Sequence, residues 1–290
     1  MKKYIAVISL LLFNLLCMSA QTDRFEQRYD LLVSKLGPAG VGVETLLNNW
    51  EKADSTDEKL LAARFNYYFA KAQSTQVVKK SSKKYLGMSP LLTLKDSLGN
   101  DVYYYQEIFY DDELFGSALK AADRAIELYP DKLDYRFMKA NAYVAYEKES
   151  PDMALAYLMD LIKADDTRSR PWTYEGRQAD EHFFEDAIQE YCFSFYQVGS
   201  PGSRDAFYRI SEKMSVLHPD NLTFLNNMGS YYMVAKEDYK TAMKLYKKVL
   251  KKNPSDAVAL QNSIVAARKL GNAKLEAKYR KQLEGISGRQ

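Results

Sequence analysis

Hydrophobic residues recur every three or four positions over most of the chain, which is the spacing of one buried face of an α-helix. The pattern predicts helices of about 12–18 residues joined by short turns. Three of the turns are alike in sequence: LYPDK at 128–132, LHPDN at 217–221 and KNPSD at 252–256. Each contains a proline, which cannot continue a helix. We therefore expect an all-α chain that is built from similar helix pairs.

The same helical face is specified before several of these turns. At equal distances before Pro254, Pro130 and Asp166 the sequence places small or apolar residues, namely Ala242, Tyr246 and Val249, then Ala118, Ala122 and Ala125, then Ala154, Leu158 and Leu161. Periodic apolar positions of this kind form the core side of a helix. We expect all of them to be buried.

The preceding helix of each pair also carries a small residue, Gly229 in LNNMGSYY and Ala140 in RFMKANAY. Two antiparallel helices approach closely only where their side chains are small. We expect Gly229 to face Ala242, and Ala140 to face Ala154. Larger side chains such as Tyr232 would fill the space between successive pairs.

Small and aromatic residues on a first helix, followed by Ala, aromatic, Ala and Pro on a second, resemble the tetratricopeptide repeat (TPR). The resemblance implies a TPR-like α-solenoid of helix hairpins, in a protein of the exported bacterial type, and it says little about function. We expect an N-terminal helical pair at 21–56, a TPR-like repeat at 57–130 with an insertion at 74–111, a TPR at 133–166, a divergent TPR-like pair at 180–219, a TPR at 222–254 and a C-terminal TPR-like pair at 257–285. Whether residues 21–56 form a true repeat stays open.

The insertion reads as a β-hairpin. In LLTLKDSLGNDVYYYQEIFY, two β-prone runs flank the turn-rich stretch DSLGND. Leu92 and Leu94 would share one face, and Tyr103, Tyr105 and Phe109 would share one face in the second strand. Because a lone hairpin is marginally stable in water, we expect one face to pack on the helices. The other face would be an exposed aromatic surface.

The first residues, MKKYIAVISLLLFNLLCMSAQ, have the form of a bacterial secretory signal: two lysines, a short apolar run and small residues. We expect residues 1–20 to be a signal peptide that is removed after Ala20. This predicts a periplasmic or secreted protein of a Gram-negative bacterium, with no transmembrane segment after cleavage. A lipid anchor at Cys17 is the alternative, which we rank lower because Leu16 replaces the small residue that lipoprotein signals carry before the cysteine.

Composition and charge narrow the class of partner. Of 290 residues, 47% are hydrophobic and 27% are charged, as in ordinary globular proteins. Removal of Lys2 and Lys3 with the signal lowers the formal net charge from +3 to +1. A nearly neutral, exported chain does not fit a nucleic-acid partner.

The sequence offers few residues for chemistry. Cys192 lies on an apolar helical face, which favours a buried thiol over a nucleophile. His182 precedes Glu185 and Asp186 by one helical turn, but no second histidine or cysteine joins them, so we expect no metal. We likewise expect no catalytic residues and no cofactor. The run KKSSKK at 79–84 is best interpreted as a solvated loop, with contact to an anionic surface as the alternative.

These observations favour a non-enzymatic scaffold that binds a protein or peptide partner in the cell envelope. The binding surface would be the concave face lined by the first helices, which includes Phe137, Asn141, Val144, Asn226, Ser230 and Met233. Some relatives of the resembled family clamp a peptide carboxylate there, but the lysines and arginine that they use are missing here. A glycan bound on the tyrosine-rich hairpin is the alternative partner. The role of the insertion, the oligomeric state and the identity of the partner are left open.

Overall fold

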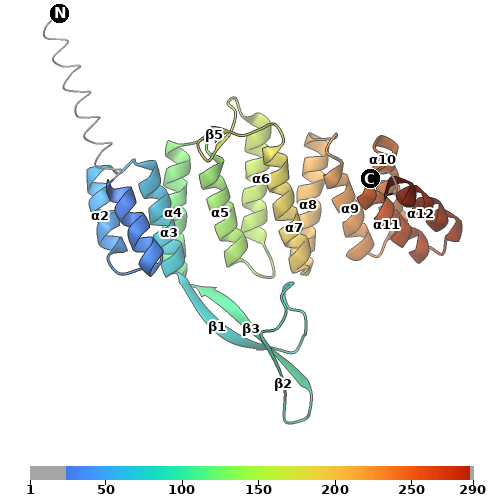
Figure 1. Cartoon of the computed structure of the whole chain (residues 1–290), viewed down its shortest axis with the longest axis horizontal. Helices are drawn as coiled ribbons and strands as arrows, with labels where there is room; N and C mark the ends of the chain where they lie inside the picture. The colour runs from blue at the N-terminus through green and yellow to red at the C-terminus, as the bar shows by residue number, and fades with distance from the viewer. Residues whose placement is uncertain (1–23, 288–290) are drawn as a thin grey trace, which may run out of the picture. The chain divides into compact units, whose positions relative to one another are not determined.

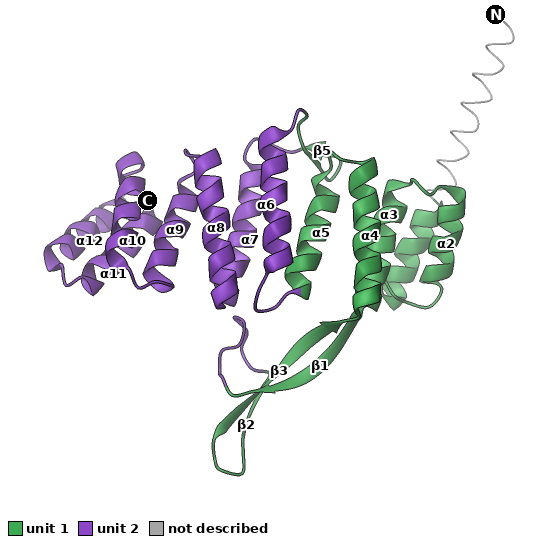
Figure 2. Ribbon diagram, turned by 180° about the vertical axis from the view of Figure 1, so that it is seen from behind, with its two compact units in different colours: residues 1–81, 91–146, 170–178 green, residues 82–90, 147–169, 179–290 purple. Residues whose placement is uncertain are grey.

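The computed structural model describes residues 24–287, so the predicted signal peptide, the cleavage site after Ala20 and Cys17 lie outside the described residues. The described chain divides into two compact units (Figure 2). Within this range, unit 1 comprises residues 24–81, 91–146 and 170–178, and unit 2 comprises residues 82–90, 147–169 and 179–287. The predicted repeat at 133–166 contributes one helix to each unit.

Unit 1 is built mainly from helices: one over residues 24–36, then α2 (Val43–Ala53), α3 (Glu58–Lys71), α4 (Asp112–Leu128) and α5 (Leu133–Tyr146). The N-termini of α3 and α4 are capped by aspartates, since Asp57 accepts from Lys59 N at 2.8 Å and Asp111 accepts from Leu114 N at 2.9 Å. The indole of Trp50, only 1% exposed, centres the core between α2 and α3.

A three-stranded antiparallel sheet joins α3 to α4, which pack against each other (Figure 1). Its strands are β1 (Gln73–Lys80), β2 (Leu92–Lys95) and β3 (Asp101–Tyr110), in the order β1-β3-β2. The predicted hairpin corresponds to β2 and β3, and β1 is an additional strand. Its sequence, QSTQVVKK, has no alternation of apolar and polar residues, and every position from Gln73 to Val77 is exposed.

The two faces of this sheet differ from the prediction in one respect. Leu92 lies opposite Tyr104 and Leu94 opposite Val102, so these leucines share a face that Tyr103, Tyr105 and Phe109 do not. Tyr105 is only 1% exposed, whereas the large side chains that are exposed on the other face are aliphatic, namely Val77, Leu92, Leu94 and Ile108. The expected exposed aromatic surface is therefore an exposed aliphatic one.

Residues 173–178 form a second, two-stranded sheet in unit 1, with β4 (Thr173–Tyr174) paired to β5 (Arg177–Gln178). Trp172 is buried beside it, and the guanidinium of Arg136 lies 5.1 Å from the centre of the indole ring. Arg170 pairs with Asp131 at 3.4 Å.

Unit 2 consists of inserted residues 82–90 and a run of helices: α6 (Asp152–Thr167), α7 (Phe183–Val198), α8 (Pro201–Leu217), α9 (Leu222–Val234), α10 (Tyr239–Lys252), α11 (Ala257–Lys269) and α12 (Ala273–Ser287). From α7 to α12 each helix packs against the next (Figure 1). The chain is thus mostly helical, with TPR-like helix pairs and small antiparallel sheets inserted. No helix within residues 24–287 is both long and apolar enough to cross a membrane.

The repeated helical face predicted from the sequence is confirmed. All nine residues of that face are buried, none more than 2% exposed: Ala118, Ala122, Ala125, Ala154, Leu158, Leu161, Ala242, Tyr246 and Val249. Their burial packs the second helix of each of these pairs, α4, α6 and α10, against the core of its unit.

The nearest neighbour of Gly229 is Tyr246, and not the expected Ala242. A Cβ atom at Gly229 would lie 2.4 Å from Cε1 of Tyr246, so the glycine makes room for the tyrosine ring. Tyr246 follows Ala242 by one helical turn and reaches farther, which is why its ring occupies the space above the glycine. Tyr232, expected to fill the space between pairs, is only partly buried.

Candidate functional site: a basic pocket in unit 2

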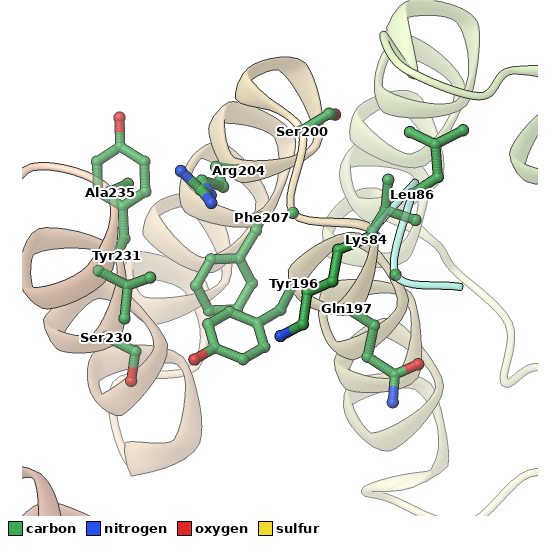
Figure 3. Close-up of a pocket in the computed structure, with 14 residues that line it drawn as sticks. Lys84, Leu86, Tyr196, Gln197, Ser200, Arg204, Phe207, Ser230, Tyr231 and Ala235 are labelled. Atoms are coloured by element: carbon green, nitrogen blue, oxygen red, sulfur yellow. The ribbon is translucent and has the colours of Figure 1, made fainter. Parts of the chain in front are cut away.

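Unit 2 contains an open pocket of about 480 Å³ between the end of α7, the start of α8, the end of α9 and the inserted segment (Figure 3). The inserted segment contributes Lys84, Leu86 and Gly87. The helices and the α7–α8 junction contribute Tyr196, Gln197, Val198, Gly199, Ser200, Arg204, Phe207, Ser230, Tyr231, Val234 and Ala235. All of these residues belong to unit 2.

The sequence VGSPGS fixes the junction between α7 and α8. Gly199 has φ = 66°, the left-handed conformation with which helices commonly end. Ser200 caps α8 by accepting from Ser203 N at 3.1 Å, and its hydroxyl donates to Glu149 O at 2.5 Å. Pro201 follows in the first turn, where a missing N–H costs nothing. The floor of the pocket is therefore held by backbone geometry.

A tight turn brings the inserted segment to the pocket. Leu86 and Gly87 both have positive φ, 50° and 75°, and Met88 N donates to Tyr85 O at 2.9 Å, as in a type I′ turn. A Cβ atom at Gly87 would lie 2.6 Å from Gln197 O. Only glycine lets the turn approach the end of α7 this closely. Leucine is a costly choice at Leu86, because bulky residues rarely adopt positive φ.

The pocket is basic. Its lining includes the ammonium of Lys84 and the guanidinium of Arg204 and no aspartate or glutamate. Figure 3 shows the two cations arriving from different segments, Lys84 from the insertion and Arg204 from α8. Within residues 24–287 neither side chain pairs with a carboxylate. Tyr196, with 42% of its surface exposed, adds an aromatic wall beside them.

Ser230 links the pocket wall to the core of unit 2. Its hydroxyl donates to Asn226 O at 3.1 Å and lies 3.3 Å from the hydroxyl of Tyr246, while Asn262 Nδ2 donates to it at 3.4 Å. Burial raises the pKa of the Tyr246 phenol to about 12, so this hydroxyl stays protonated at neutral pH. The network fixes one wall of the pocket through neutral hydrogen bonds.

The binding residues predicted from sequence fall into two groups. Ser230 lines the pocket, and Met233 is partly buried on the same helix. Asn226 is only 6% exposed and donates to Asp256 Oδ1 at 3.2 Å, and Asp256 in turn caps α11 through Ala259 N. The structure thus gives Asn226 a structural contact, and of Asn226 and Ser230 only Ser230 lines the pocket.

The other three predicted residues lie on α5, in unit 1. Phe137 is 8% exposed, and the centre of its ring lies 6.1 Å from that of Tyr174. Val144 is partly buried, and Asn141 is exposed. These residues belong to a different unit from Ser230, so the pocket contains only one of the six predicted residues.

The histidines and the cysteine of unit 2 make structural contacts. His218 Nδ1 lies 3.1 Å from Glu185 Oε1, and Asn221 donates to the same carboxylate at 2.6 Å. Cys192 is buried with its sulfur 3.6 Å from Ser211 Oγ, and burial raises the pKa of its thiol to about 12. In the described part of the chain, no group of three or more His, Cys, Asp or Glu is placed to hold a metal ion.

Sequence reasoning missed the pocket as a whole, although one signal was present. Lys84 is the last residue of KKSSKK, for which the sequence predicts a solvated loop, with contact to an anionic surface as the alternative. Arg204 lies far from it in sequence, and no local pattern connects the two. Their proximity depends on the long insertion in the middle of a helix pair.

Comparison with known proteins adds a partial match. The coatomer epsilon subunit family matches residues 193–288, less than half of the chain. Fourteen chains in solved structures match, among them two crystal structures of MamA, each at 14% identity and a TM-score of 0.40. Each of the two MamA matches covers 61% of this chain, and they cover 85% and 91% of the respective MamA chains. No curated protein sequence matches. The chain is similar to TPR-like proteins, and these matches assign it no partner.

Proposed function

We propose that this chain is a non-enzymatic scaffold of the bacterial cell envelope, which binds a protein or peptide partner at the basic pocket of unit 2. The observation that carries the proposal is the pocket itself, an open concavity with fixed walls on a stack of TPR-like helix pairs. Concave surfaces of stacked helix repeats are the usual binding surfaces of such proteins.

Exposed aromatic and apolar side chains next to the pocket support a protein partner. Phe193 is 50% exposed and lies one helical turn before Tyr196 on α7, so the two share a face. Val234, at 43% exposure, lines the pocket from α9. Aromatic side chains are enriched where proteins bind each other.

A location in the cell envelope is part of the proposal and is supported by the signal-like residues 1–20. The glycan alternative has less support, since stacking on a sugar requires exposed aromatic faces. Tyr105 is buried, and Tyr103 is only partly exposed.

Site-specific photocrosslinking tests the proposal. Tyr196 is replaced by benzoylphenylalanine, which is also aromatic, and the protein is irradiated in intact cells. The control carries the same group at Lys248, an exposed position on α10. We expect a defined crosslinked protein from position 196 and none from position 248. Equal crosslinking from both positions, or none from position 196, would contradict a partner site in this pocket.

A further inference from the structure

Resting on the proposed function, we propose that the pocket recognises an acidic segment of the partner, with aspartate or glutamate carboxylates bound between Lys84 and Arg204. The two cations reach the pocket from different segments of the chain, and no acidic residue lines it. A carboxylate-bearing chain is the complement of such a surface.

The pairing of the other arginines makes Arg204 unusual. In the described part of unit 2, every other arginine lies within 4.0 Å of a carboxylate: Arg168 with Asp165, Arg209 with Asp205, and both Arg268 and Arg280 with Glu276. Arg204 has no such partner, although Asp205 follows it directly in the sequence. Its planar guanidinium is suited to bind a carboxylate through two parallel hydrogen bonds.

The surroundings of Arg204 strengthen the attraction for an anion. Arg204 lies in the first turn of α8, a helix of 17 residues whose N-terminus carries partial positive charge. Lys84 adds a second full charge from the insertion. Two separated cations fit a segment with more than one carboxylate better than a single small anion.

Several of the other lining residues are apolar and fit the neighbours of those carboxylates. Leu86, Phe207 and Val234 form walls that would accept an aliphatic or aromatic side chain of the same segment. Leu86 holds its place at φ = 50°, where glycine or asparagine would be less strained. A leucine at this strained position is explained if its side chain serves as a wall of the binding site.

Fluorescence anisotropy with two short labelled peptides tests this inference on the purified protein. One peptide alternates glutamate with tyrosine, and the other replaces each glutamate by glutamine. We expect the glutamate peptide to bind more tightly. Arg204→Gln and Lys84→Gln should each weaken it by about tenfold, the usual effect of losing one hydrogen bond to a charged group. Arg209→Gln, on the same helix, and Lys248→Gln should change it less than twofold.

Equal loss in the control variants would show that general surface charge binds the peptide, and equal binding of both peptides would show that the pocket does not select acids. Either result overturns the inference. Vesicles containing phosphatidylglycerol that outcompete the glutamate peptide would point to a membrane instead and overturn it as well. If the crosslink from position 196 persists undiminished in Arg204→Gln and Lys84→Gln, the acidic partner is wrong and the scaffold function stands. If that crosslink is absent when neither Lys84 nor Arg204 is changed, the proposed scaffold function itself is contradicted.

Discussion

At the scale of single residues, the contact between Gly229 and Tyr246 decides how α9 and α10 pack. From sequence alone, alanine at 229 looks harmless, because Ala140 holds the equivalent place in another pair. The structure reverses this expectation, since a methyl group at 229 would overlap a fully buried tyrosine ring. We predict that Gly229→Ala lowers the free energy of unfolding by about 1–3 kcal/mol, the usual cost of overpacking.

Gly116 on α4 supplies the matched control, because a Cβ atom there meets nothing within 4 Å. Gly116→Ala should raise the free energy of unfolding by up to about 1 kcal/mol, since alanine favours the helix. Urea denaturation followed by circular dichroism measures both variants. If Gly229→Ala is as stable as Gly116→Ala, the tyrosine ring does not occupy the space that the structure gives it.

Cys192 gives a second test at this scale. Because burial raises the pKa of its thiol, the reactive thiolate is scarce at neutral pH, and reagents cannot reach the sulfur. We predict that the envelope-purified protein fails to react with Ellman's reagent until urea unfolds it. Rapid labelling of Cys192 in the folded protein would contradict the burial of its sulfur on α7.

At the scale of elements, the turn formed by residues 85–88 controls the pocket. Gly87→Ala places a methyl group against the carbonyl of Gln197 and adds the cost of positive φ, about 1–2 kcal/mol. We predict that the turn moves away from α7 and that binding of the glutamate peptide falls to the level of Lys84→Gln. Gly99→Ala carries the same backbone cost without a clash, since φ of Gly99 is 83° and a Cβ atom added there meets no atom within 4 Å. Peptide affinity should therefore be unchanged in that variant, and the helical circular dichroism should be retained in both.

The same elements show what sequence can and cannot predict here. The face formed by Ala242, Tyr246 and Val249 follows from helical periodicity alone. The pairing of β2 with β3 follows from two β-prone runs around the turn residues of DSLGND. Strand β1 was missed because its polar sequence pairs through backbone hydrogen bonds with β3, which leave no apolar pattern. The pocket was missed for a related reason. It depends on where a long insertion returns to the helices, and no local rule specifies that.

At the scale of the whole molecule, export remains a proposal with a direct check. We predict that the protein purified from the envelope begins at Gln21, because the signal-like zones end in small residues and Leu16 disfavours lipid attachment at Cys17. Intact-mass spectrometry measures the start of the chain. A species that begins at Cys17 and carries acyl chains, or one that retains Met1, would contradict this assignment.

The central claim is that the basic pocket of unit 2 is where the partner binds. Hydrogen exchange, measured by mass spectrometry on the protein alone and with the partner that was captured from position 196, tests it most directly. We predict slower exchange on binding in residues 82–90, at the α7–α8 junction and at the end of α9, with little change in α12. Slower exchange confined to β2 and β3 would instead place the partner on the aliphatic face of the inserted sheet and contradict the account.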